Sequence, residues 1–224
     1  IPVLFKSKRI KEAAGMQLGF YFDQTRCIGC FTCVVACKDW HDVEAGPASW
    51  RRVKSIERGK FPDVFVASLS IACCHCAEPA CVLACPADAI TKRQEDGIVV
   101  VNPEMCLGKD RCELCLQACP YEAPQFSAED NAKMHMCDLC LDRWAEGKRP
   151  ICVDSCPMRA LDAGPIDDLR AKYGDTKEAV GFLYSAETEP SITFKPRKDG
   201  TGGILERRSK LKRRRPGRSE PNKG

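Results

Sequence analysis

The sequence predicts an α+β fold in which a short strand, a cysteine-rich loop and a short helical turn follow one another repeatedly. Three observations predict it. Sixteen of the 17 cysteines fall into four runs with a common ending. Short segments of aromatic or β-branched residues precede three of these runs, and aromatic residues make up only 7% of the chain. We therefore expect little conventional apolar core, with the cysteine-rich loops supplying much of the cohesion.

Each of the four runs contains four cysteines and closes with a C-x3-C step, and proline follows three of them. They are Cys27-x2-Cys30-x2-Cys33-x3-Cys37, Cys73-x2-Cys76-x4-Cys81-x3-Cys85, Cys106-x5-Cys112-x2-Cys115-x3-Cys119 and Cys137-x2-Cys140-x11-Cys152-x3-Cys156. Run one has the C-x2-C-x2-C-x3-C spacing of bacterial ferredoxins, in which the fourth cysteine binds the other of two clusters. The spacing therefore predicts [4Fe–4S] clusters, each needing four thiolates.

Disulfides and zinc are the alternatives at this cysteine density. Disulfide frameworks are typical of small secreted domains, which this chain of 224 residues exceeds. Four-cysteine zinc sites usually combine two separated C-x2-C pairs, which only run four resembles. Sixteen cysteines, at four for each cluster, predict four [4Fe–4S] clusters.

One cysteine is then left over, at the adjacent pair Cys73 and Cys74. Neighbouring side chains of an extended backbone point in opposite directions, so both cannot easily bind one cluster. Cys73 stands three positions before Cys76, which repeats the first step of runs one and four. We assign Cys73 as the ligand and Cys74 as a small buried thiol.

The strands are placed by their β-branched and aromatic residues. The segments are residues 20–22 before run one, 64–66 and 69–71 before run two, and 98–101 before run three. The C-x3-C segments, such as Cys81 to Cys85, are expected to begin short helical turns, with the fourth cysteine at the start of a helix. Beyond the last run, residues 166–173 could form a helix and residues 191–196 a strand or extended arm.

Charge is concentrated at the C-terminus. Residues 205–224 hold nine Lys or Arg and two Glu, a net charge of +7, whereas the whole chain carries only +4. A nucleic-acid interface needs a basic folded face, which the mildly acidic remainder does not indicate. We expect residues 207–218 to bind an acidic partner surface, with an anionic membrane and a passive solvated tail as the alternatives. No apolar run approaches the roughly 18 residues of a membrane span.

Four stretches carry a family resemblance: CIGCFTCVVACK from Cys27, CxHCxxPACxxxCP from Cys73, ACPYEAPQ from Ala118 and CDLCxxRxxxGxxPxCVxxCP from Cys137. In combination, over residues 20–165, they resemble the four-cluster iron–sulfur subunits of the dimethyl sulfoxide reductase superfamily. The resemblance implies a partner subunit that holds molybdenum or tungsten on a pterin cofactor. It also implies a membrane-anchor or other redox partner, in a peripheral membrane-associated complex on an undetermined face of the membrane.

The resemblance further implies that ligands cross between paired runs. The implied sets are Cys27, Cys30, Cys33 and Cys156; Cys137, Cys140, Cys152 and Cys37; Cys73, Cys76, Cys81 and Cys119; and Cys106, Cys112, Cys115 and Cys85. Cys106-x5-Cys112 is three residues longer than the usual step of the family, but all four thiols remain. We expect two ferredoxin-like two-cluster modules, an outer one at 1–60 and 125–165 and an inserted one at 61–124, followed by a C-terminal arm and tail at 166–224.

The expected function is electron transfer without catalysis by this chain alone, since no Ser–His–Asp or Cys–His pair suggests a substrate site. A polyferredoxin-type carrier or hydrogenase adapter is the first alternative, and a zinc-stapled interaction protein is the second. His75 is expected to pack beside a cluster without binding iron, because histidine ligation in a Rieske centre needs two histidines. Lys38 is either a cation that raises the potential of a cluster or a solvent-facing lysine.

Overall fold

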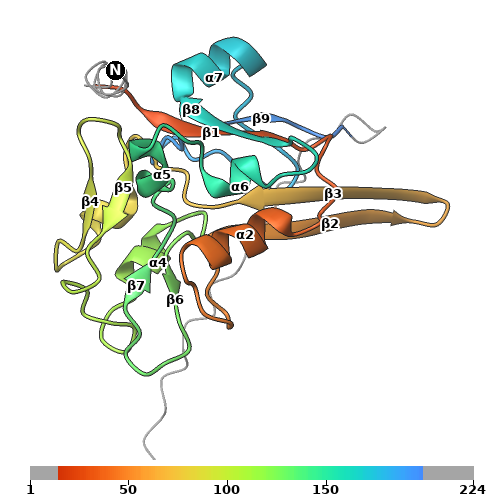
Figure 1. The fold of residues 1–224 in the computed structure, drawn as a ribbon. Helices are drawn as coiled ribbons and strands as arrows, with labels where there is room; N and C mark the ends of the chain where they lie inside the picture. The colour runs from red at the N-terminus through yellow and green to blue at the C-terminus, as the bar shows by residue number, and fades with distance from the viewer. Residues whose placement is uncertain (1–14, 199–224) are drawn as a thin grey trace, which may run out of the picture.

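The structure is a computed structural model and describes residues 15–198. In this part of the chain, nine strands form four small sheets and six short helices connect them, which confirms the α+β class (Figure 1). No helix between residues 15 and 198 has the length and apolar character to cross a bilayer. The basic tail, for which we predict an acidic partner, lies outside the described residues.

The largest sheet has the order β8-β1-β9. Its central strand, β1 (Leu18–Asp23), is buried along its whole length. It pairs antiparallel with β8 (Leu161–Pro165) and parallel with β9 (Ile192–Lys195). The helix α7 (Ile166–Tyr173) packs against this sheet around Tyr21. Because β1 precedes run one and β8 follows run four, their pairing joins these two distant parts of the sequence.

A long hairpin of β2 (Arg52–Lys60) and β3 (Asp63–Ile71) projects from the body of the molecule (Figure 1). The two predicted segments at 64–66 and 69–71 are parts of β3, which is one continuous strand. No sequence pattern indicated β2, because seven of its nine residues are polar, charged or glycine, and Val53 and Ile56 do not fall on one face of a strand. Only the last five residues of β3, where the hairpin enters the body, are buried.

Two further strand pairs lie beside the middle cysteine runs. The predicted strand at 98–101 is β5 (Val99–Val101), which pairs antiparallel with β4 (Ile90–Lys92). The second pair consists of β6 (Gln125–Phe126) and β7 (Met134–His135). Both pairs are short, so neighbouring loops and helices must supply most of their packing.

The short helices bring the runs together in pairs. The third cysteine of each run lies within a helix: α2 (Thr32–Trp40), α3 (Ala80–Leu83), α4 (Leu114–Ala118) and α6 (Ile151–Asp154). α2 packs against α6, and α3 packs against α4. The helix α5 (Leu141–Ala145) follows Cys140. Runs one and four therefore meet through their helices, as do runs two and three.

Two expectations about this architecture were wrong. The fourth cysteine does not begin a helical turn in runs two to four, because it follows the end of the helix and the next proline opens a turn. The apolar core is also more substantial than the low aromatic content suggested. Phe22, Phe182 and Phe194 are almost fully buried, and Tyr121 stacks on Phe182 with ring centroids 4.7 Å apart. Two of these rings come from the segment after residue 166, which crosses back over the body.

Candidate metal centres

All 17 cysteines carry free thiols, and two groups of four line cavities of nearly equal size. The first cavity, whose empty space of about 330 Å³ includes open solvent, is lined by Cys27, Cys30, Cys33 and Cys156 together with apolar residues and Ser70. The second, with about 320 Å³ counted in the same way, is lined by Cys85, Cys106, Cys112 and Cys115 and by apolar residues. Each group takes three thiols from one run and one from another. Equal size and identical donors at two separate places indicate that both cavities suit the same kind of group.

A third group gathers where α2 packs on α6. Burial raises the pKa of Cys37 and of Cys140 to about 12, and negative charge on Cys152 adds to both rises. The pKa of Cys137 is raised by burial and then by Cys37. These four thiols thus lie within electrostatic reach of one another, although Cys37 comes from run one.

The fourth group has the same reciprocal composition. Burial raises the pKa of Cys76 to about 11 and that of Cys81 to about 12, and negative charge on Cys119 adds to both. The pKa of Cys73 is raised by burial and then by Cys81 and Cys76. The structure thus brings cysteines of runs one and four together, and likewise cysteines of runs two and three.

The start of every run contains the same local backbone feature. The residue two positions after the first cysteine has a positive φ angle in all four runs: Gly29 (70°), His75 (44°), Gly108 (91°) and Leu139 (60°). This conformation folds the backbone over the cysteine, and the amides of His75 and Leu139 each donate to its Sγ at 3.4 Å. Sequence reasoning missed this feature because two of the four residues are not glycine.

The ends of runs two to four form a second repeated turn. Four residues after the last cysteine, the amides of Ala89, Ala123 and Ala160 donate to the sulfurs of Cys85, Cys119 and Cys156 at 3.3 to 3.4 Å. The residue before each alanine has a positive φ angle. Run one lacks the proline, and there the backbone amide of Arg51 helps to lower the pKa of Cys37 against the effect of burial.

The donor set fits [4Fe–4S] clusters. A buried thiol is hard to ionise, as the raised pKa values show, but a bound metal deprotonates its thiol ligands outright. Backbone amides directed at cysteine sulfurs stabilise thiolates and help to set the potential of an iron–sulfur cluster. Thiols gathered from paired runs, several with such amides, are the donors that a [4Fe–4S] cube would require at each place.

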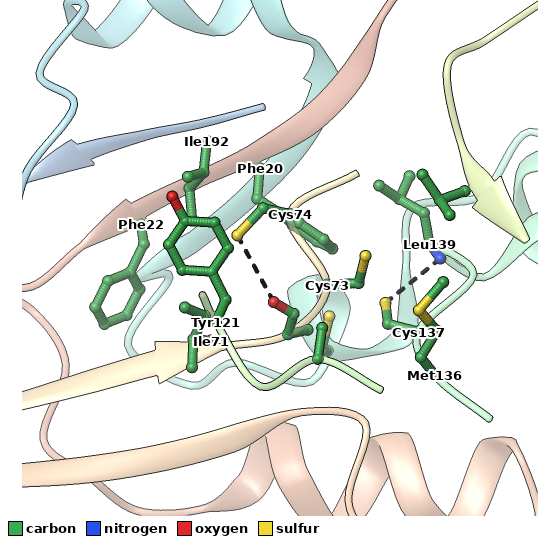
Figure 2. Packing of buried hydrophobic residues seen from close by; sticks show 14 of the residues in the cluster. Phe20, Phe22, Ile71, Cys73, Cys74, Tyr121, Met136, Cys137, Leu139 and Ile192 are labelled. Atoms are coloured by element: carbon green, nitrogen blue, oxygen red, sulfur yellow. Dashed lines mark hydrogen bonds between the residues drawn. The ribbon is translucent and has the colours of Figure 1, made fainter. Parts of the chain in front are cut away.

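Cys73 and Cys74 lie in different surroundings (Figure 2). Cys73 points toward Cys137 and Leu139, whereas Cys74 points to the opposite side, toward Tyr121 and Phe20. The Cys74 thiol is 2% exposed and donates to the carbonyl of Ala72 at 3.8 Å, a weak hydrogen bond. Both thiols are near Cys76, so proximity alone does not choose the ligand. The direction of the side chain and the turn at His75, two residues after Cys73, favour Cys73.

His75 is fully buried, and its ring is held by one hydrogen bond. Its Nδ1 accepts from the amide of Val99 at 3.1 Å, so the ring proton is on Nε2. Nε2 has no partner among the described residues. Burial lowers the pKa of His75 to about 3, which keeps the ring neutral. A neutral ring with one free N–H agrees with the expected packing role beside a cluster.

Lys38 is half-buried, and its ammonium group is held by the backbone. Its ammonium donates to the carbonyls of Glu44 and Gly46, at 3.1 and 3.2 Å. The cation close to the thiols is instead Arg51, which is 2% exposed. Sequence reasoning missed it because a charged residue next to a polar strand is normally at the surface.

Comparison with known proteins agrees with this geometry. Residues 64–166 match the family described as a 4Fe-4S dicluster domain. The sequence is 47% identical over 188 residues to one chain of the anaerobic dimethyl sulfoxide reductase of Escherichia coli, covering 80% of this chain and 89% of that protein. The corresponding reductase chain of Haemophilus influenzae is 43% identical over 191 residues, covering 81% and 90%. A sulfite dehydrogenase subunit of Allochromatium vinosum is 32% identical over 205 residues, covering 81% and 84%.

These similarities extend well beyond the cysteine runs, since they cover four fifths of the chain. Together with the four thiol groups, they exclude a zinc-stapled interaction protein as the explanation of the cysteines. This protein belongs to the iron–sulfur subunits of the dimethyl sulfoxide reductase family, which transfer electrons through [4Fe–4S] clusters and are not catalytic on their own.

Proposed function

We propose that the chain carries four [4Fe–4S] clusters and relays electrons between a molybdopterin-containing catalytic subunit and a membrane-anchor or other redox partner. The observation that carries the proposal is that cysteines of paired runs come together, with four thiols lining each of two cavities. A polyferredoxin-type carrier would need the same clusters, so the partner distinguishes the two functions. Identity of 47% to a protein named as one chain of a reductase favours a subunit of a complex.

The proposed ligands follow the thiol groups. The sets are Cys27, Cys30, Cys33 and Cys156; Cys37, Cys137, Cys140 and Cys152; Cys73, Cys76, Cys81 and Cys119; and Cys85, Cys106, Cys112 and Cys115. Each set exchanges one ligand with its paired run, as in two-cluster ferredoxins. The packing of α2 on α6 and of α3 on α4 supports this exchange.

This exchange supports two nested modules. The outer one comprises residues 1–60 and 125–165 and the inserted one residues 61–124. Bound clusters supply one-electron redox chemistry at each set. The protein supplies the surroundings that set each potential: amides directed at sulfurs, apolar walls that exclude water, and buried charge. The complex is proposed to be peripheral to a membrane.

Anaerobic purification of the full chain with its stable partners tests the proposal. We expect sixteen iron atoms and sixteen acid-labile sulfides for each chain, together with a co-purifying subunit that contains molybdenum or tungsten. Iron and sulfide corresponding to two clusters, or zinc in place of iron, would refute the four-cluster assignment. Full cluster content in a chain that purifies alone at physiological salt would favour the polyferredoxin-type carrier.

A further inference from the structure

Arg51 is a buried cation placed between two of the thiol groups. It immediately precedes β2, and its side chain is 2% exposed. Its Nη1 donates to Ser70 Oγ at 3.2 Å, and Ser70 Oγ lies 3.4 Å from Cys33 Sγ. Because Ser70 accepts from the arginine, its own hydroxyl proton is free to be donated to the sulfur. The charge is thereby connected to the group of Cys27, Cys30, Cys33 and Cys156.

The same guanidinium also reaches the neighbouring group. Burial by itself would lower the pKa of Arg51, but negative charge on Cys152, Cys33, Cys137 and Cys37 raises it above its ordinary value. In return, the positive charge of Arg51 lowers the pKa of Cys152, against the effect of burial. Three of these four thiols belong to the group formed where α2 packs on α6.

The surroundings of Arg51 provide no other compensation for its charge. No carboxylate of residues 15–198 forms an ion pair with it, and its Nε and Nη2 have no hydrogen-bond partner among those residues. The Phe20 ring lies under the guanidinium, with Cζ 4.7 Å from the ring centroid. A buried cation without a counter-charge is costly, so an anion is expected to lie against it. A cluster with four thiolate ligands carries a net negative charge and meets this requirement.

We propose that Arg51 is a shared counter-charge for the two clusters on either side of it, and that it raises the midpoint potentials of both. The inference rests on the four-cluster function proposed above. Reduction adds negative charge to a cluster, so a fixed cation nearby stabilises the reduced form and makes the potential less negative. Arg51 is a positioning residue that binds no iron; Ser70 connects it to one of the two clusters.

One charge between two clusters has a consequence that two separate surface charges would not have. The low-dielectric interior screens Arg51 little, so its effect reaches both sets at once. An electron on one cluster disfavours an electron on the next, and the attraction of the cation for both electrons offsets this penalty. Arg51 therefore raises both potentials together.

Redox titration of the full chain in its purified complex, followed by electron paramagnetic resonance, tests this inference. In Arg51→Met we expect two of the four midpoint potentials to become more negative and the other two to stay in place. Arg51→Lys keeps the charge and should restore most of the shift. Arg170→Met is the matched control, because Arg170 lies on α7, is partly exposed and pairs with Asp167 and Asp175. It should move no potential.

The outcomes distinguish the effect of Arg51 on the midpoint potentials from the presence of four clusters in the chain. Fewer than four clusters in the unaltered chain would refute the proposed function itself. Four clusters with unchanged potentials in Arg51→Met, or an equal shift in Arg51→Lys, would refute the role of Arg51 alone. If Arg51→Met loses iron, Arg51→Gln provides the test, because it removes the charge and keeps a hydrogen-bond donor for Ser70. We then expect the same two potentials to fall, and four unchanged potentials would overturn the proposal.

Discussion

At the scale of single residues, the adjacent thiols Cys73 and Cys74 show how orientation separates a ligand from a packing residue. Both are almost completely buried, and burial raises the pKa of both well above the ordinary value. Only Cys73 receives an amide hydrogen bond from His75, two residues further on. Cys74 faces the aromatic core, where a small thiol fills space and needs no metal.

Replacing each of these thiols by alanine should therefore give different results. We expect Cys74→Ala to keep all four clusters and to cost at most about 1–2 kcal/mol, because it leaves only a small cavity. Cys73→Ala should lose one cluster or convert it to a three-iron form. Iron and sulfide analysis with electron paramagnetic resonance measures both outcomes. Equal iron loss in the two variants would show that the ligand assignment at this pair is wrong.

At the scale of elements, β1 joins the parts of the chain that carry runs one and four, and Gly19 is the residue of β1 that its neighbours approach most closely. A Cβ added at Gly19 would collide with the carbonyl oxygen of Ser191, just before β9, and would lie 3.1 Å from Cδ1 of Ile166. Gly164, its partner in β8, has no atom within 4 Å of an added Cβ. The two glycines thus form a matched pair in one sheet register.

Gly19→Ala should destabilise the cluster-loaded protein by about 1–3 kcal/mol, because backbone atoms must move to accept the added methyl group. Gly164→Ala should be neutral or slightly stabilising, since it reduces the entropy of the unfolded state without a clash. Thermal unfolding of both variants, followed by circular dichroism under anaerobic conditions, measures the difference. Equal stability of the two variants would contradict the close approach of β1 to Ser191.

The paired helices support a second prediction at this scale. Cys156 follows α6 but lines the cavity of Cys27, Cys30 and Cys33. We expect Cys156→Ser to remove or convert the cluster bound near α2 and to spare the cluster held by Cys137, Cys140 and Cys152. Spectroscopy of Cys156→Ser alone and combined with Cys27→Ser measures this. If Cys27 and Cys156 bind the same cluster, the double variant loses no more iron than Cys156→Ser alone. A larger iron loss in the double variant, equal to the sum of the two single losses, would refute the exchange of ligands.

The elements also show which features could be predicted from the sequence and which could not. Metal ligation requires a fixed residue type at fixed spacing, so the sixteen cysteines could be proposed as ligands from the sequence alone. The strand β2 could not be recognised, because most of its residues are polar or charged and its stability comes from pairing with β3. Arg51 and the left-handed conformations of His75 and Leu139 were missed for a related reason. They depend on what folding places beside them, which residue type alone does not reveal.

At the scale of the whole molecule, cysteines are part of one continuous core together with aromatic residues from both ends of the described chain. Cys33, Cys81 and Cys115 are buried in the same cluster as Phe22 and Phe194. No disulfide holds the loops, since all the thiols are free. Bound iron would therefore connect segments that are far apart in sequence. Because the unfolded chain has no preformed site, the free energy of cluster binding would stabilise the folded state.

Removal of iron tests how far the fold depends on these connections. Anaerobic chelation should leave cavities lined by thiols whose apolar walls alone cannot hold the loops in place, so cooperative thermal unfolding should be lost. Far-ultraviolet circular dichroism and calorimetry of the cluster-free chain measure this loss, and iron with sulfide should restore the transition. Cys74→Ala, tested in the same way, controls for the loss of a thiol that binds no metal. If the cluster-free chain keeps a cooperative transition, the core around Phe22, Phe182 and Phe194 is sufficient by itself. The clusters would then bind to a fold that the apolar side chains already determine.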